Sequence, residues 1–309
     1  MARIVADKLS PKARAIVDQI AALPQLPTLT PVEARGRPAP LEAAPEAVGS
    51  VTARTIPGPA GPIAIRIYRP KDGLRAALVY FHGGGWVVGS LESADATCRA
   101  LTNRSRCVVI SIGYRLAPEH KFPAAVDDAY AATRWAADNA SELRIDPPRI
   151  AVGGASAGGN LAAAVALRAR ERGGPKIAFQ LLTVPVTELS SKAESHREFA
   201  EGYGLSAADM TWFGMHYVRT PADADDPLAS VLRADLHDLP PAFVITAECD
   251  PLRDDGEAYA EKLRKLGIAA RYKRYPGMFH GFMSFPRTLP EADEAFEDAG
   301  KALREALGS

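Results

Sequence analysis

Apolar and polar positions follow regular patterns through most of this 309-residue chain. Residues 63–68 alternate with a period of two, which predicts a strand, and short apolar runs further along predict buried strands. Helical patterns lie between them, so we expect a mainly parallel sheet covered by helices on both faces. The predicted strands are 63–68, 77–81, 107–111, 150–153, 178–184, 243–247 and 270–275, and the predicted helices are 11–22, 93–104, 126–139, 161–172, 257–266 and 291–307.

Two segments interrupt this alternation. Residues 23–59 are rich in proline and have little periodicity, which is typical of a segment that wraps a surface. Residues 187–238 add aromatic and charged positions between two strands that need only one crossover helix. We therefore expect an N-terminal arm at 1–59, a core formed by 60–186 and 239–309, and an insertion at 187–238 that packs with the arm as a cap over the sheet.

Composition narrows the classes of function. Hydrophobic residues make up 47% and charged residues 24% of the chain, which is ordinary for a globular protein, and the formal net charge is zero. This balance gives no electrostatic footprint for nucleic acid or an anionic membrane. The chain has no long apolar segment of the signal or membrane-spanning kind, so we expect a cytoplasmic location. Three scattered cysteines predict neither disulfides nor a zinc site.

The clearest chemical signal is the segment Gly154-Ala155-Ser156-Ala157-Gly158, directly after the apolar run 150–153. Gly-x-Ser-x-Gly between a strand and a helix is the nucleophile elbow of an α/β-hydrolase. Ser156 must sit on a strained turn, and side chains at Gly154 and Gly158 would collide with the neighbouring strand and helix. The helix that follows directs its N-terminal N–H groups toward the serine.

A second glycine-rich segment, His82-Gly83-Gly84-Gly85-Trp86, follows the strand predicted at 77–81. After an early strand in this fold, such a loop supplies backbone N–H groups to an oxyanion, and the residue after the nucleophile, Ala157, supplies another. His82 precedes Ser156 in the chain, whereas the base of this fold follows its serine. We therefore expect His82 to brace the loop through hydrogen bonds.

The base and the acid are expected on loops after later strands, in the order serine, acid, histidine. His280 follows the last predicted strand, where site residues of parallel sheets gather. Glu248 and Asp250 both follow the strand at 243–247 and both qualify by position. Asp250 lies further onto the loop, so it is our choice. Asp254 and Asp255 are expected to cap the next helix.

These motifs together resemble the bacterial hormone-sensitive-lipase family of carboxylesterases (family IV). The resemblance runs from about residue 63 to the C-terminus and includes Asp-Pro-Leu-Arg-Asp at 250–254, His-Gly-Phe at 280–282 and the segment 114–120. It implies an α/β-hydrolase core with a helical cap, esters with short to medium acyl chains, and no cofactor. It also implies oxyanion donors at Gly84, Gly85 and Ala157, with Gly83 as an alternative. A homodimer is expected from the resemblance alone.

One position departs from the family. Its elbow usually has Asp before the serine, and here Ala155 stands there, which puts the rigidity of the loop and the efficiency of catalysis in question. The charged residues of 114–120 (Arg115, Glu119 and His120) are expected to form a structural network rather than substrate contacts. The residues expected to line an acyl pocket are Trp86, Tyr203, Trp212, Phe213, Met215 and Phe282.

The leading hypothesis is a serine carboxylesterase that works through an acyl-enzyme, with Ser156, His280 and Asp250 as nucleophile, base and acid. Two alternatives remain. The same residues serve amide and peptide hydrolases, which the sequence separates poorly from esterases. A non-catalytic ligand-binding member of the fold would usually lack one of the three residues, and all three are present here.

Overall fold

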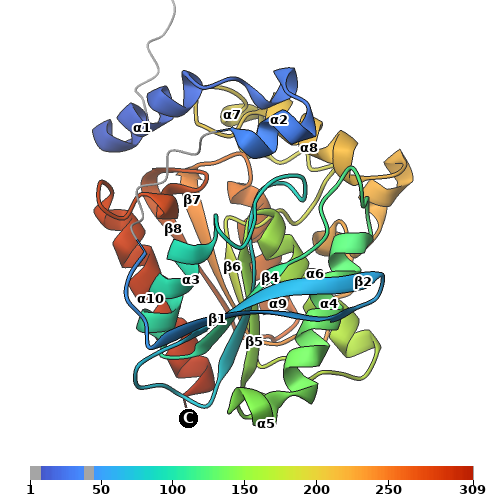
Figure 1. Ribbon diagram of the computed structural model, residues 1–309. Coiled ribbons are helices and arrows are strands. Elements are labelled where there is room, and N and C mark those ends of the chain that lie inside the picture. Colours follow the sequence, from blue (N-terminus) through green and yellow to red (C-terminus); the bar gives the residue numbers. More distant parts are fainter. Residues whose placement is uncertain (1–7, 38–44, 309) are drawn as a thin grey trace, which may run out of the picture.

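The apolar runs form the centre of one eight-stranded sheet in the computed structural model, which describes residues 8–37 and 45–308 (Figure 1). Its order is β1-β2-β4-β3-β5-β6-β7-β8, in which β1, β2 and β4 pair antiparallel and every later pairing is parallel. This confirms the predicted α/β-hydrolase architecture. The strands are β1 (Ser50–Gly58), β2 (Gly61–Arg69), β3 (Ala77–Phe81), β4 (Val108–Gly113), β5 (Ile150–Ala155), β6 (Phe179–Thr183), β7 (Ala242–Cys249) and β8 (Ala270–Phe279).

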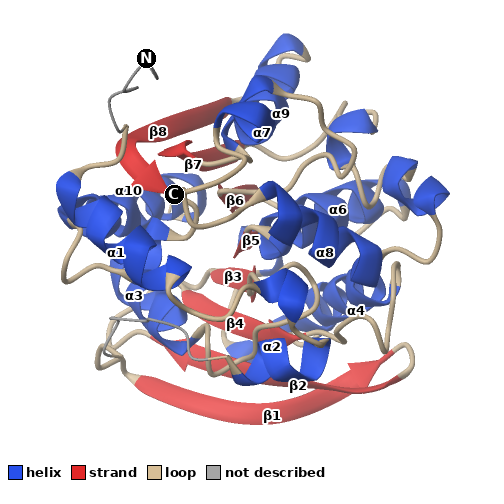
Figure 2. Ribbon diagram, turned by 90° about the horizontal axis from the view of Figure 1, so that it is seen from above, coloured by secondary structure: helices blue, strands red, loops and turns tan. Residues whose placement is uncertain are grey.

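Helices cover both faces of the sheet, and the central strand β3 is buried along its whole length. Its Val79 packs into the apolar cluster on the side of α4, α6 and α9, whereas Leu78 and Tyr80 pack on the side of α3 and α10 (Figure 2). A strand buried on both faces needs apolar residues at every position, which is why the run is uninterrupted. These helices are α3 (Asp95–Ser105), α4 (Ala124–Asp138), α6 (Ala157–Glu171), α9 (Arg253–Lys265) and α10 (Pro290–Leu307), and the short α5 (Ala140–Leu143) follows α4.

Four helices from two distant parts of the chain lie beyond the carboxyl ends of the parallel strands (Figure 1). We call these helices and their connections the cap: α1 (Pro11–Ala21), α2 (Pro31–Gly36), α7 (Glu194–Glu198) and α8 (Ala207–Tyr217). Trp212 on α8 donates from its indole Nε1 to the carbonyl oxygen of Leu29 at 3.2 Å, which joins the two parts. None of the described helices is long and apolar enough to cross a membrane.

The structure differs from the predicted segments in two places. Residues 50–58, expected in the arm, form the edge strand β1 and pair with β2 from Ser50–Arg69 to Gly58–Gly61. Residues 231–238, expected in the cap, pack against the core instead: Lys262 of α9 donates to the carbonyl oxygens of Leu232 and Ala234, both at 2.7 Å. Residues 1–7 and 38–44 of the expected arm lie outside the described residues.

Candidate active site

Ser156 occupies a sharp turn between the end of β5 and the start of α6, with φ 56° and ψ −118°. A non-glycine residue adopts this region only at a cost of about 1–3 kcal/mol, which the surrounding structure must offset. A Cβ on Gly158 would lie 2.0 Å from the carbonyl oxygen of Phe81, and one on Gly154 would lie 2.4 Å from the carbonyl of Gly158. The two glycines therefore allow the close approach that lifts Ser156 out of the sheet edge.

Ser156, His280 and Asp250 form a hydrogen-bonded chain. The Ser156 hydroxyl donates to His280 Nε2 at 3.0 Å, and His280 Nδ1–H donates to Asp250 Oδ2 at 2.8 Å. Asp250 is fully buried, and its second oxygen accepts the N–H of Leu252 at 2.9 Å. The three residues follow the carboxyl ends of β5, β7 and β8, so the parallel sheet brings them together from positions far apart in the sequence.

Glu248, the other candidate acid, points elsewhere. Its Oε2 accepts the N–H of Gly277 at 2.7 Å, which ties the end of β7 to β8. The carboxylate that faces the imidazole is therefore that of Asp250, and Glu248 holds the strand ends that carry Asp250 and His280.

The glycine loop lies directly beside Ser156. A Cβ on Gly83 would stand 3.6 Å from the Ser156 Cβ, so Gly83 is a close neighbour of the nucleophile. Gly84 has φ 114° and packs on Val88, and Gly85, with φ 56°, lies against the Phe213 ring of the cap. Among the described residues, the N–H groups of Gly83, Gly84, Gly85 and Ala157 have no backbone acceptor.

His82 braces this loop. Its Nδ1–H donates to the carbonyl oxygen of Gly83 at 2.7 Å, and Tyr114 stacks on the ring at 4.2 Å and donates to the His82 carbonyl at 2.8 Å. Burial lowers the pKa of His82 to about 4, so the ring is neutral at neutral pH. The neighbouring segment is also structural, because Arg115 pairs with buried Asp128.

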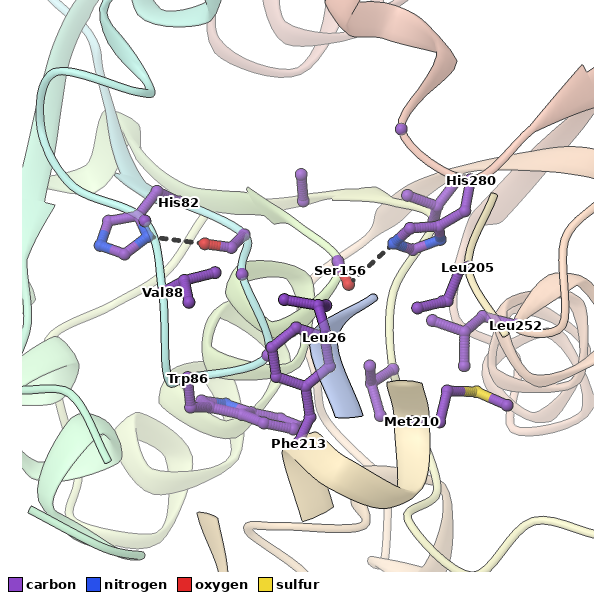
Figure 3. Close-up of a pocket in the computed structure, with 18 of the residues that line it drawn as sticks. Leu26, His82, Trp86, Val88, Ser156, Leu205, Met210, Phe213, Leu252 and His280 are labelled. Carbon is purple, nitrogen blue, oxygen red and sulfur yellow. Dashed lines mark hydrogen bonds between the residues drawn. The ribbon is translucent and has the colours of Figure 1, made fainter. Parts of the chain in front are cut away.

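A cavity of about 1130 Å³ with mainly apolar walls contains Ser156 and His280 (Figure 3). Three of the residues expected to line an acyl pocket border this cavity: Trp86, Phe213 and the exposed Met215. Ala155 lines it as well. Several further apolar residues line the cavity that the sequence does not mark, because each is an ordinary apolar position without a motif: Leu26, Val88, Leu205, Met210 and Leu252.

The other three expected pocket residues belong to the packing instead. Tyr203 packs edge to face on Phe199, and Phe282 is fully buried beside Tyr275. Trp212 is buried between α8 and the arm. An aromatic residue in a cap satisfies the same composition rule whether it faces the cavity or the core, and only the tertiary structure separates the two.

Comparison with known proteins agrees with this geometry. Residues 78–284 match a family model described as the alpha/beta hydrolase fold. Carboxylesterase NlhH of Mycobacterium tuberculosis is 43% identical over 252 residues, which cover 79% of this chain and 79% of that protein. A hyperthermophilic esterase from Pyrobaculum calidifontis is 46% identical, with a TM-score of 0.92, and the match covers 96% of this chain and 98% of that one.

The chain belongs to the hormone-sensitive-lipase family of carboxylesterases. A further relative, an ethyl acetate hydrolase of Pseudomonas putida, is 41% identical over 253 residues, covering 79% of each chain. In this carboxylesterase, no group of three or more His, Cys, Asp or Glu side chains among the described residues could hold a metal ion.

One polar side chain that anchors the cap to the core belongs to no sequence motif. Arg35 on α2 donates to the carbonyl oxygens of Val87 and Ala117, both at 2.9 Å, and pairs with Glu119 at 2.6 Å. It thereby fixes the arm to the segment just after the glycine loop. Thr30 and Glu33 form a capping box at the start of α2, which the sequence could have indicated. The helix itself could not be predicted, because its six residues are too few to show a helical period.

Proposed function

We propose that this carboxylesterase hydrolyses short- to medium-chain carboxylic esters through an acyl-enzyme on Ser156. The observation that carries the proposal is the chain from Asp250 through His280 to the Ser156 hydroxyl, inside a cavity with apolar walls. As Ser156 Oγ attacks the ester carbonyl, His280 Nε2 takes its proton, and Asp250 stabilises the imidazolium. His280 then protonates the leaving alcohol, and water attacks the acyl-enzyme by the same route.

The oxyanion is the second part of the proposal. The tetrahedral oxygen forms beside Ser156, so N–H donors without a Cβ in the way must approach it closely. We assign this role to Gly83, Gly84 and Ala157, because Gly83 is the glycine adjacent to the Ser156 Cβ and Gly85 lies beneath the cap ring of Phe213. Relative to the sequence expectation, Gly83 takes the place of Gly85.

The proposed chain length rests on the cavity. A volume of about 1130 Å³ would by itself hold longer chains as well, so the limit we propose comes from the aliphatic and aromatic side chains of the cap that line the cavity. Initial rates on p-nitrophenyl esters from acetate to dodecanoate should therefore pass through a maximum at a short or medium chain and fall at dodecanoate. A rate that rises steadily to dodecanoate would contradict this assignment.

The nucleophile is tested by labelling. A fluorophosphonate should modify Ser156, as mapped by mass spectrometry of the digested protein. Ser156→Ala should lose both the label and nearly all turnover while its circular dichroism spectrum is unchanged, because the residual rate comes only from binding and the oxyanion donors. Labelling of a different serine, or a variant that keeps wild-type turnover, would contradict the proposal.

A further inference from the structure

Helix α7 of the cap contacts the loop that carries Asp250. The Ser195 hydroxyl donates to the carbonyl oxygen of Pro251, the residue after Asp250, at 2.6 Å. The N–H of Asp254 donates back to the same hydroxyl at 3.3 Å, and the Ser195 N–H donates to Asp254 Oδ2 at 2.9 Å. Ser195 is fully buried, so these contacts do not exchange freely with water.

The next residue of α7 makes a second contact. His196 Nε2 lies 3.0 Å from Asp255 Oδ2, and the other oxygen of Asp255 accepts the Ser191 hydroxyl at 2.6 Å. Asp255 is 2% exposed, whereas Ser191 and His196 also line the cavity that contains Ser156. Asp255 was expected only as a helix cap, and the structure gives its carboxylate two partners from the cap segment instead.

Further links end on the same short stretch. Thr187 Oγ1 donates to the carbonyl oxygen of Asp255 at 2.9 Å, and Glu198 accepts from Arg253 at 3.2 Å. All of these partners lie within five residues of Asp250. The segment 187–198 therefore grips the loop 250–255 by hydrogen bonds and ion pairs, in addition to covering the cavity.

Asp250 depends on the main chain of this loop. One of its oxygens is held by the Leu252 N–H, and the other faces His280. A shift of the peptide at Pro251 would move the carboxylate relative to the imidazole. Misplacement of a catalytic group by ~1 Å can cost roughly 10²-fold in rate, so small movements of this loop matter.

We propose that Ser195 and His196 are positioning residues, which act through the loop 250–255 to keep Asp250 aligned with His280. This inference rests on the proposed function, because it needs Asp250 to act as the acid. It makes the cap part of the catalytic alignment, whereas a lid over the substrate would need no contact with this loop.

The test compares variants that remove a contact with variants that keep it. Ser195→Ala removes both hydroxyl contacts, and His196→Leu removes the link to Asp255. His196→Gln keeps an N–H donor near the Nε2 position and should retain at least half of the wild-type kcat. Ser206→Ala is the control, because Ser206 caps its own helix α8 through Asp209 and has no hydrogen bond to residues 250–255.

The readouts are kcat per phosphonate-titrated active site and the pH profile of kcat/KM, both on p-nitrophenyl acetate. For Ser195→Ala and His196→Leu we expect kcat to fall about tenfold with KM within about twofold, since orientation is lost and binding is kept. The acid limb of the profile should move to lower pH, because a misaligned Asp250 stabilises the imidazolium less. Loss of stability alone would lower the number of titrated sites and leave both readouts unchanged.

The outcomes separate the two proposals. If the wild type is not labelled at Ser156, the proposed function is wrong. If the wild type is labelled and active, but His196→Leu and Ser195→Ala match it in kcat per site and pH profile, the positioning role alone is wrong. Should Ser195→Ala not fold, the comparison of His196→Leu with His196→Gln decides: equal kcat values in that pair would overturn the inference.

Discussion

At the scale of single residues, Asp250 and Glu248 form a natural pair for comparison, because both are carboxylates at the end of β7. Asp250→Asn should lower turnover by about 10⁴-fold, the size of the effect in a serine protease, because the histidine tautomer is no longer fixed. Glu248→Gln should lose less than about tenfold, since it contacts the Gly277 N–H rather than His280. Kinetics on p-nitrophenyl butyrate would check this, and the reverse ranking would move the acid to Glu248.

Burial of His82 predicts that the free energy of unfolding depends on pH. Its pKa falls from 6.5 to about 4 in the folded protein, so the unfolded chain binds the proton more readily. The stability that depends on neutral His82 is complete above pH 6.5 and is lost as pH falls toward 4, by about 3 kcal/mol in all. His82→Asn keeps a donor for the Gly83 carbonyl without titrating. Urea unfolding of both proteins at pH 7 and pH 4.5 should show the smaller decrease in the variant.

The hydrogen-bonded neighbours Ser156, Asp250 and His280 could be predicted from the sequence, because their order and their positions after strands follow from the fold. The direction in which an aromatic side chain near the site points could not. Tyr203, Trp212 and Phe282 satisfied the expected composition of a pocket, yet each found a partner in the interior. Our proposal of Gly83 rather than Gly85 as an oxyanion donor likewise depends on where Phe213 lies, which the sequence does not show.

At the scale of elements, two adjacent aromatic residues of α8 face different surroundings. Phe213 lines the cavity and lies against Gly85, whereas Trp212 faces the arm. Phe213→Ala should move the optimum of the chain-length profile to longer esters, because a pocket wall discriminates by roughly 1–3 kcal/mol per methylene. Trp212→Ala should leave the optimum in place and reduce the free energy of unfolding by about 3–5 kcal/mol. Ester profiles and urea unfolding of both variants test this, and equal shifts of the optimum would contradict it.

The alternating strands and helices were predictable because each has a clear period and apolar content. Strand β1 was not, because Pro57 and Pro59 suggested an irregular segment and six of its nine residues are exposed. It is an edge strand, and it is held in place by pairing with β2 although its own sequence does not alternate between apolar and polar residues along its whole length. Helices α2 and α7 have six and five residues, too few for periodicity to register.

At the scale of the whole molecule, the cap unites two segments that are more than 150 residues apart in the chain. Arg35 is its polar anchor on the arm side. Arg35→Ala should lower Tm by ~1.5–3 °C, because it removes contacts worth about 1–2 kcal/mol in total from a protein of this size. It should also raise KM for longer esters more than for acetate, since α2 borders the cavity. Calorimetry and KM values test this, with the exposed pair Arg54–Glu142 as the control through Arg54→Ala.

The anchoring of α1 has a consequence for folding during synthesis. The Ser10 N–H donates to the carbonyl oxygen of Gly277 at 3.0 Å, three residues before His280. Ser10 is synthesised long before its acceptor, Gly277. Until the end of β8 has been made, the apolar face of α1, with Ile16 and Val17, lacks part of the surface on which it packs. The apolar residues of α1 are therefore exposed during synthesis, and the active site can be completed only after residues 250–280 have been made.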